Sequence, residues 1–191
     1  MTQPADTSGP MAGEPVTAGA WLVVIDMQAV FADPASGWAV PRFAMAAAGI
    51  DRLRPAFAGR TVHTRFVAPA EPAGAWRDYY RQWPWALQPP DAPLYRLVDD
   101  AGPSVDRPAF GKWSPELDAA TGGSRDLVLA GVSTDCCVLS TALAAADDGV
   151  RVRVAADACA GATDADHQRA LAAMALYTPL ITVTTVGALL A

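Results

Sequence analysis

Residues 127–149, LVLAGVSTDCCVLSTALAAADDG, give the strongest indication of how this chain folds. The segment begins with an apolar run from Leu127 to Ala130, which has the length and composition of a buried parallel strand. It turns at Gly131 and continues as a sequence rich in alanine and leucine, which is typical of a helix. A strand that leads directly into a helix is the repeating unit of a parallel α/β sheet.

Two adjacent cysteines, Cys136 and Cys137, lie where this strand turns into the helix. The positive end of the helix dipole and the free backbone N–H groups of a first turn both favour an anion, and so favour the reactive thiolate. The alternative is that both cysteines pack as small apolar residues, as most free cysteines do. Adjacent Cα atoms, about 3.8 Å apart, are too close for an ordinary disulfide. The position alone leaves nucleophile and packing residue both open.

The composition excludes several classes of protein. The chain has 191 residues, of which 52% are hydrophobic and 18% charged, which predicts one domain with a full core. The net charge is −6 and no cluster of Lys or Arg is present, so neither nucleic acid nor an anionic membrane surface is an expected partner. The longest apolar runs have the length of strands and predict no membrane span.

The cellular compartment and the domain boundary follow from the cysteines and the N-terminus. Three cysteines without a disulfide framework predict a reducing cytoplasm. Residues 1–19 are rich in Pro, Gly, Thr and Ala, and they lack the basic and apolar regions of a secretory signal. We therefore expect residues 1–19 to form a flexible tail and residues 20–191 to form a single domain.

Apolar periodicity predicts an alternation of strands and helices. Strands are expected at residues 21–26, 61–66, 127–131, 150–155 and 180–184, and helices at 41–58, 76–82, 115–121, 137–148 and 164–177. This alternation predicts a three-layer α/β/α sandwich with a mainly parallel central sheet and Rossmann-like topology. Ligands of such sheets bind beyond the carboxyl ends of the strands. Asp26 ends one predicted strand and Cys137 follows another, so both are expected at that edge.

Three blocks of the sequence resemble the isochorismatase-like cysteine hydrolase family, which includes nicotinamidases and N-carbamoylsarcosine amidases. The blocks are WLVVIDMQAVF at 21–31, GVSTDCCVLSTAL at 131–143 and VAADACAGATDADHQRAL at 154–171. Their order matches the family's first strand, its nucleophile turn, and the strand and helix that follow. The resemblance extends from Trp21 to the C-terminus and implies the isochorismatase-like fold.

The resemblance also implies a mechanism. Asp26 aligns with the family's general base and Cys137 with its nucleophile, which forms a thioester acyl-enzyme. The backbone N–H groups of Ser133 and Cys137 align with the oxyanion hole, and relatives have a cis peptide bond at the position of Val132–Ser133. Phe31 aligns with an aromatic residue of the pocket.

The cation of the family's catalytic triad has two candidates here. Aligning Phe110, Gly111 and Trp113 with the family's landmarks puts Arg107 at the position of the triad lysine. Arginine keeps the positive charge but has a larger, planar head group that does not give up a proton. Lys112, five residues later, could supply an ammonium by a local rearrangement. The sequence leaves Arg107 and Lys112 both open.

The residues after the second strand differ from those of nicotinamidases, which carry Asp and His metal ligands there. The matching stretch runs from Arg65 to Ala68 as Arg-Phe-Val-Ala and offers no such ligand. The two histidines, His63 and His167, are far apart in sequence and are expected to be structural. We therefore expect no metal and no other cofactor.

Residues 69–93 form an aromatic excursion between the second and later strands. Long loops of this kind are often lids or binding loops, which makes Trp76 and Tyr80 candidate substrate contacts. Alternatively, their aromatic side chains pack the excursion onto the sheet or onto a second subunit. Trp38 joins Phe31 as a candidate pocket wall, and Arg65 could pair with a substrate carboxylate or with a nearby acid.

Together these features predict a metal-independent cysteine amidohydrolase that cleaves the C–N bond of a small carboxamide or N-carbamoyl compound. One alternative is an isochorismatase-type hydrolase of a vinyl ether, although such enzymes usually lack the cysteine. Another is a weakly catalytic member that serves as a binding or assembly protein. The expected partner is a small-molecule substrate, and relatives are commonly oligomers, which implies a homo-oligomer.

Overall fold

The computed structural model describes residues 18–99 and 104–191. Most of the predicted tail, residues 1–17, lies outside the described residues. The described chain forms a six-stranded sheet with the order β3-β2-β1-β4-β5-β6, in which every pair of neighbours is parallel. The strands are β1 Trp21–Ile25, β2 Thr61–Phe66, β3 Ser104–Arg107, β4 Asp126–Val132, β5 Arg151–Ala160 and β6 Ile181–Thr184.

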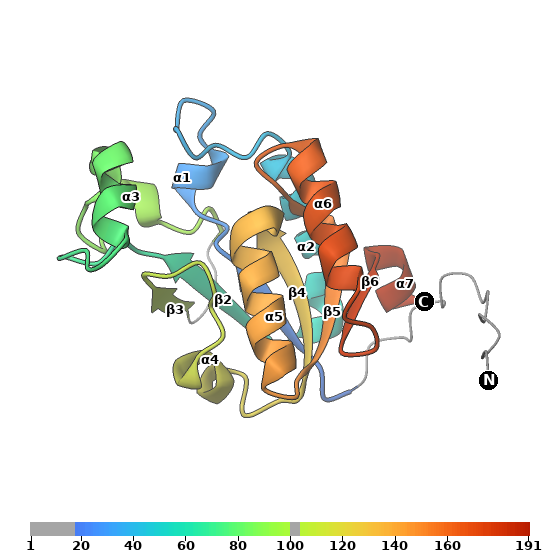
Figure 1. Ribbon diagram of the computed structural model, residues 1–191. Coiled ribbons are helices and arrows are strands. Elements are labelled where there is room, and N and C mark those ends of the chain that lie inside the picture. The colour runs from blue at the N-terminus through green and yellow to red at the C-terminus, as the bar shows by residue number, and fades with distance from the viewer. Residues whose placement is uncertain (1–17, 100–103) are drawn as a thin grey trace, which may run out of the picture.

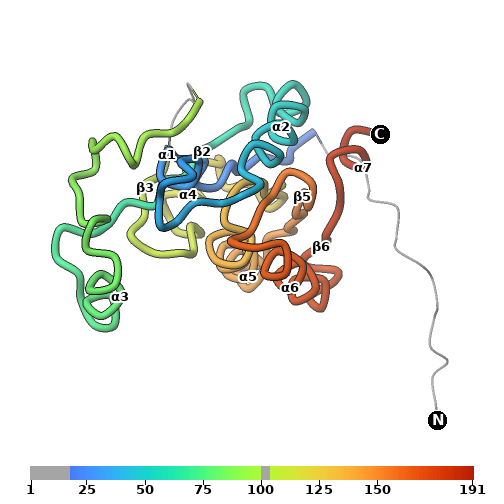
Figure 2. Tube along the Cα trace, turned by 90° about the horizontal axis from the view of Figure 1, so that it is seen from above, coloured from blue at the N-terminus to red at the C-terminus, as the bar shows by residue number. Residues whose placement is uncertain are grey.

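Helices cover both faces of the sheet and form the predicted three-layer sandwich (Figure 1). The α-helices are α1 Ala29–Ala32, α2 Phe43–Leu53, α3 Trp76–Gln82, α4 Pro115–Ala120, α5 Leu139–Asp147, α6 Asp164–Ala175 and α7 Val186–Leu190. Helices α5 and α6 pack on one face together with α4, whereas α2 and α7 pack on the other. Figure 2 shows the sheet between these layers, with α3 standing beyond the β2–β3 side.

The sheet is parallel throughout because every strand is followed by a crossover, and its central strands are buried on both faces. Along β1, Leu22 and Val24 contribute to the core under α2, while Val23 and Ile25 contribute to the core under α5 and α6. Gly131 of β4 has φ +122°, and a Cβ there would lie 2.1 Å from the Ile25 carbonyl oxygen. Only glycine allows β4 to approach the end of β1 this closely.

All five predicted strands are present, and the fold prediction is confirmed. The structure adds β3, a short edge strand whose side chains are only exposed or half-buried and which therefore lacks the apolar run of a central strand. Strand β5 continues to Ala160, five residues beyond its predicted end. Helix α5 begins at Leu139 because residues Thr134–Val138 form one π-helical turn first.

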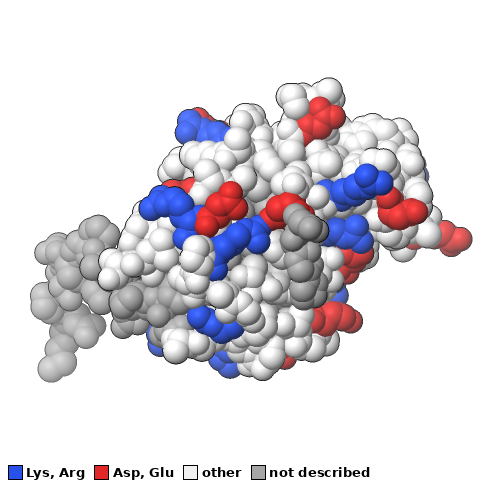
Figure 3. Space-filling view, turned by 180° about the vertical axis from the view of Figure 1, so that it is seen from behind, with Lys and Arg blue, Asp and Glu red and all other residues white. Residues whose placement is uncertain are grey.

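The remaining short elements connect the sheet to the loops. Turns of 3-10 helix occur at η1 Arg54–Phe57, η2 Pro84–Ala86 and η3 Pro93–Tyr95. No helix within residues 18–99 and 104–191 combines the length and the apolar character that a membrane crossing needs. Figure 3 shows acidic and basic side chains interspersed over the described part of one face.

Candidate active site

Asp26 lies directly after β1, at the carboxyl edge of the sheet. Its side chain is fully buried, and its backbone has φ +50°, in the left-handed region that Asp tolerates better than most residues. Thr64 of the neighbouring strand β2 holds it in two ways. The Thr64 hydroxyl donates to Asp26 Oδ1 at 2.7 Å, and its oxygen accepts from the Asp26 backbone N–H at 3.3 Å. These contacts fix the direction of the carboxylate.

Lys112 supplies the cation next to this carboxylate. Its Nζ lies 3.0 Å from Asp26 Oδ2, and both side chains are fully buried. The same ammonium donates to the Ala109 carbonyl at 2.9 Å and lies 4.8 Å from the centre of the Phe66 ring. A buried ion pair of this kind is stabilised only where further polar or cation–π contacts complete its surroundings, which is the case here.

Arg107, the other candidate, points elsewhere. It ends β3, and its Nη1 lies 3.6 Å from Oε2 of Glu116, an exposed residue of α4. The structure therefore brings Lys112, and not Arg107, to Asp26. The local rearrangement expected for Lys112 is a loop that turns the lysine inward between β3 and α4.

Cys137 lies in the π-helical turn after β4 and is 3% exposed. The peptide bond between Val132 and Ser133 is cis, which confirms that prediction. The carbonyl of Ser133 accepts from the backbone N–H groups of Cys136 and Val138 at 3.2 and 3.1 Å, and these bonds close the turn. The structure thus places the proposed oxyanion residues, Ser133 and Cys137, on the two sides of one tight turn.

Thr141 of α5 links the cysteine turn to the lysine loop. Its hydroxyl donates to the Cys137 carbonyl at 2.6 Å, and its oxygen accepts from the Lys112 backbone N–H at 2.9 Å. Two segments that are far apart in sequence are therefore held by one buried hydroxyl group. The spacing between Cys137 and Lys112 is set by α5 and not by either loop alone.

The surroundings of Cys137 favour the neutral thiol. Burial raises the pKa of Cys137 well above its ordinary value; the negative charge of Asp26 and a hydrogen bond to it raise that pKa further, and Lys112 partly opposes the shift. The helix-start environment, expected from the sequence to favour thiolate, is thus outweighed by burial and by Asp26. The carboxylate beside this thiol is that of Asp26.

A cavity of about 310 Å³ opens over the thiol. Its walls are mainly aromatic and come from α1 and the segment after it, from β2, from α3 and its following loop, from the loops after β3 and β5, and from the cysteine turn. The lining side chains are Phe31, Trp38, Val40, Phe66, Tyr79, Trp83, Phe110, Ser133, Asp135, Cys136 and Cys137, with Gly37, Ala39 and Ala162. A mainly apolar pocket with a few polar groups at one end is typical of sites for small molecules.

The predicted substrate contacts divide into two groups. Phe31 and Trp38 line the cavity, with ring centres 6.2 Å apart in a stacked arrangement. Arg65, Trp76 and Tyr80 are not among the lining residues. Arg65 makes a bidentate pair with Asp106 of β3, and its Nε lies 2.7 Å from that carboxylate.

Trp76 and Tyr80 face the core instead, as in the packing alternative. Trp76 packs against Phe66 and Phe110 at ring-centre distances of 6.3 and 5.1 Å, and Tyr80 is 2% exposed. The helix that carries them, α3, is therefore anchored to the sheet by this aromatic packing. Tyr79 of the same helix is the residue that reaches the cavity.

Several lining residues had no signal in the sequence. Phe66 and Phe110 were not predicted as pocket residues, and Tyr79 and Trp83 belong to the aromatic excursion, for which substrate binding and packing were both left open. Burial raises the pKa of Tyr79 most strongly, and Cys136 and Cys137 contribute to that shift, so the Tyr79 side chain lies close to both thiols. Helical periodicity alone does not show which face of α3 meets the sheet, so it could not identify Tyr79 as the residue that reaches the cavity.

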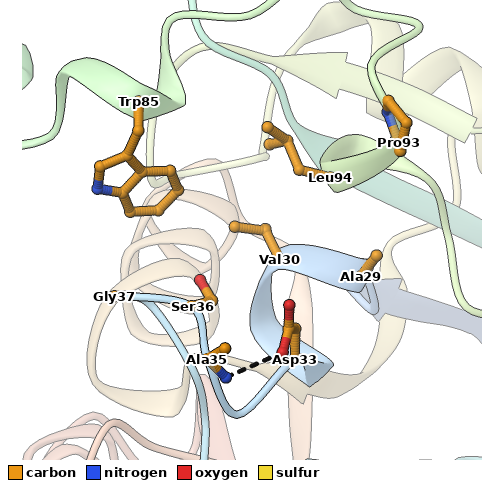
Figure 4. Close-up of a pocket in the computed structure, with 9 residues that line it drawn as sticks. All are labelled: Ala29, Val30, Asp33, Ala35, Ser36, Gly37, Trp85, Pro93 and Leu94. Carbon is orange, nitrogen blue, oxygen red and sulfur yellow. Dashed lines mark hydrogen bonds between the residues drawn. The ribbon is translucent and has the colours of Figure 1, made fainter.

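A second cavity, of about 460 Å³, lies on the other side of Gly37 (Figure 4). Trp85 faces Val30 and Leu94 across it, and Asp33 accepts from the Ala35 N–H at 2.9 Å. Trp85 also packs on Trp38 at a ring-centre distance of 4.8 Å. The tryptophan pair therefore separates this cavity from the one above Cys137.

The two histidines lie apart from each other. His63 is 2% exposed in β2, and its Nε2 lies 3.5 Å from Nη1 of Arg54. His167 of α6 shares a hydrogen bond of 2.8 Å with the Thr134 hydroxyl, behind the cysteine turn. Within residues 18–99 and 104–191, no three His, Cys, Asp or Glu side chains are grouped to hold a metal ion.

Comparisons with known proteins agree with this architecture. A cysteine hydrolase from Pseudomonas syringae pv. phaseolicola 1448A is similar over 96% of this chain and 97% of its own, with 20% identity and a TM-score of 0.82. An isochorismatase-like hydrolase from Alkaliphilus metalliredigens is similar over 88% and 95%, with 20% identity and a TM-score of 0.74. The zinc complex of a pyrazinamidase from Pyrococcus horikoshii matches over 87% and 99%, with 22% identity and a TM-score of 0.67.

At these identities the solved structures establish the fold. No curated protein matches the chain by sequence. The family model that describes the isochorismatase domain at the level of sequence matches residues 20–186, which is most of the chain. The chain belongs to the isochorismatase-like hydrolase family.

Proposed function

We propose that this hydrolase is a cysteine amidohydrolase that cleaves the C–N bond of a small carboxamide or N-carbamoyl compound. The observation that carries the proposal is the buried group formed by Asp26, Lys112 and Cys137 at the base of the aromatic cavity. A carboxylate paired with an ammonium next to a protonated thiol is the arrangement that a base-activated thiol nucleophile requires.

In the first half of the reaction, Asp26 takes the thiol proton while Cys137 Sγ attacks the carbonyl carbon. The C=O bond becomes a C–O⁻ bond in the tetrahedral intermediate, and the backbone N–H groups of Ser133 and Cys137 are the proposed donors to that oxygen. The proton on Asp26 passes to the leaving nitrogen, the C–N bond breaks, and ammonia or an amine departs. A thioester on Cys137 remains.

In the second half, water replaces the amine. Asp26 takes a proton from the water as its oxygen attacks the thioester carbon, and a second tetrahedral intermediate forms. This intermediate collapses with cleavage of the C–S bond, the proton returns to the sulfur of Cys137, and the acid is released. No oxidant, reductant or cofactor is needed for this balance.

The charges of Lys112 and Asp26 cancel, so the buried pair has no net charge. The Lys112 ammonium compensates the charge of the buried Asp26 carboxylate, 3.0 Å away. Because it also opposes the upward pKa shift of Cys137, it lowers the free energy of the thiolate as that forms. Lys112 thus takes the place that the resemblance assigned to a lysine.

The residues favour amide chemistry over the vinyl-ether alternative. Hydrolysis of a vinyl ether needs a proton donor at the double bond and no nucleophilic thiol. In this chain the buried thiol of Cys137 lies at the floor of the cavity. The metal-independent form of the reaction is proposed because the last residue of β2, Phe66, and the two residues after it, Val67 and Ala68, have no side chains that bind metals.

The proposal is tested by ammonia release from a panel of primary amides and ureido compounds, with Cys137→Ala as the control. We expect turnover of at least one apolar amide by the wild-type chain and none by the variant. Equal release by both proteins would contradict the proposal. Absence of release from the whole panel, with Cys137 also unreactive toward iodoacetamide, would favour a binding or assembly protein.

A further inference from the structure

The cavity above Cys137 is lined by a negatively charged side chain but by no lysine or arginine. Among its lining residues Asp135 is the only one with a carboxylate. The other walls are aromatic or aliphatic side chains and the two thiols. A charged group of a bound molecule would therefore meet a carboxylate and aromatic faces.

Asp135 is held in place and leaves one oxygen open. Oδ1 accepts from the Ser133 hydroxyl and from the Ala162 N–H, the latter at 2.9 Å. Oδ2 is approached by the Cys136 thiol at 3.7 Å, which is a weak donor. Gly161 allows this placement, because a Cβ there would lie 2.8 Å from Asp135 Oδ1. Among the described hydrogen bonds Oδ2 has only this weak donor, with which a stronger donor in the cavity would compete.

The cationic side chains that follow or precede lining residues closely in sequence, Lys112, Arg65 and Arg42, already have acidic partners. Lys112 lies below the floor and pairs with Asp26 at 3.0 Å, with no exposed surface. Arg65 is held by Asp106, and Arg42 pairs with Asp164 on the outer surface at 2.5 Å. A carboxylate brought into the cavity would thus lose its hydration without gaining a described cation as partner.

We propose that this site selects amides without a carboxylate, and that Asp135 is the residue that sets the selection. The inference rests on the proposed function and narrows its substrate class. Uncharged aromatic amides and amides with a protonated amine are accepted, because aromatic faces and the Asp135 carboxylate both attract a cation. Ureido acids and other carboxylate-bearing amides are rejected.

Three benzamides that differ at the para position test this: benzamide, 4-(aminomethyl)benzamide and 4-carbamoylbenzoate. Their binding to the Cys137→Ala protein is measured by calorimetry, and their hydrolysis by the wild-type chain is measured as ammonia release. We expect the anionic probe to bind about 100-fold more weakly than benzamide and the cationic probe to bind at least as tightly, a spread typical of an unpaired charge in a site of low polarity. Comparable binding of all three, or tightest binding of the anion, would overturn the inference.

The role of Asp135 is tested in Asp135→Asn, which keeps an oxygen for Ser133 and Ala162. The matched control is Asp147→Asn, which makes the same change of net charge at an exposed position in the last turn of α5. We expect the ratio of the dissociation constants of the anionic and neutral probes to fall about tenfold in Asp135→Asn and to stay unchanged in the control. If both variants keep native tryptophan fluorescence and show the same ratio of dissociation constants, Asp135 does not set the selection.

The two arms also separate this inference from the proposed function. Because binding is measured without turnover, the expected order of affinities can hold even if no probe is hydrolysed, and that outcome counts against the amidohydrolase alone. Hydrolysis of 4-carbamoylbenzoate as fast as benzamide supports the amidohydrolase and counts against the selection.

Discussion

Replacing Lys112 by Met removes the ammonium and keeps most of the apolar stem. In the structure this change leaves the Asp26 carboxylate fully buried, with the Thr64 hydroxyl and the Cys137 thiol beside it but no cation. Breaking a buried ion pair from one side typically lowers the free energy of unfolding by about 3–5 kcal/mol. We expect a loss of this size in Lys112→Met.

Arg107→Met is the matched control, because it removes the other candidate cation. Arg107 reaches the exposed Glu116 at 3.6 Å, and such surface pairs contribute about 0–1 kcal/mol. The expected difference between the two variants is therefore at least about 2 kcal/mol in unfolding. Urea denaturation followed by tryptophan fluorescence at pH 7 measures both variants under the same conditions.

Activity is expected to separate the variants more widely. Loss of the positioned acid–base system at Cys137 lowers kcat/KM by about 10²–10⁴-fold in Lys112→Met, whereas Arg107→Met stays close to wild type. A double variant, Asp26→Leu with Lys112→Met, removes both buried charges and is expected to recover much of the stability but none of the activity.

Two results would refute this reasoning. Equal stability and activity of Lys112→Met and Arg107→Met would show that the buried pair has no special role. Recovery of activity in the double variant would show that Asp26 is not the base.

Three further predictions concern residues near the site. Thr141→Val removes the hydroxyl that joins the Cys137 carbonyl to the Lys112 N–H; it should lower the unfolding free energy by about 1–3 kcal/mol and lower kcat more than it raises KM, and an unchanged kcat would contradict its positioning role. Burial, reinforced by the charge of Arg54, lowers the pKa of His63 to about 4 from 6.5, so its contribution to stability is complete above pH 6.5 and is lost as the pH falls toward 4. Between pH 7 and pH 4.5 the free energy of unfolding, measured in urea, should therefore fall by roughly 2–3 kcal/mol less in His63→Leu than in the wild-type chain. An equal fall in both proteins would contradict the assignment. Burial and Asp135 raise the pKa of Cys136 to about 11, so its alkylation by iodoacetamide, followed by peptide mass spectrometry, should be slow at pH 8 and increase toward pH 11; fast labelling at pH 7 would oppose this.

The sequence predicted the central part of the fold well because its apolar runs are long and buried on both faces. The β1 segment WLVVI and the β4 segment around LVLA are of this kind. Strand β3 was not predicted, because its sequence SVDR lies at the sheet edge and carries little apolar surface. The π-helical turn before α5 was also missed, since its bonds to the Ser133 carbonyl depend on the folded turn.

The positions of two candidate site residues could be predicted, because Asp26 and Cys137 each come at the carboxyl end of a strand. Asp26 and Cys137 follow β1 and β4, which pair with Ile25 opposite Gly131, so topology alone brings them to one edge. The choice between Arg107 and Lys112 depends on which way a loop turns, and Thr141 of a distant helix determines that. Arg65 was proposed as a substrate contact because its partner, Asp106, lies on the strand that was not predicted.

The central claim is that an acyl group is transferred to Cys137. It is tested most directly by mixing the wild-type chain with the best amide of the panel, quenching in acid, and locating any acyl mass increase by peptide mass spectrometry. We predict a thioester on the peptide that carries Cys137, formed in step with ammonia release and absent in Asp26→Asn. Ammonia release with the acyl group on Cys136, or with no acyl-enzyme even when hydroxylamine is added to intercept a thioester as its hydroxamate, would contradict the account.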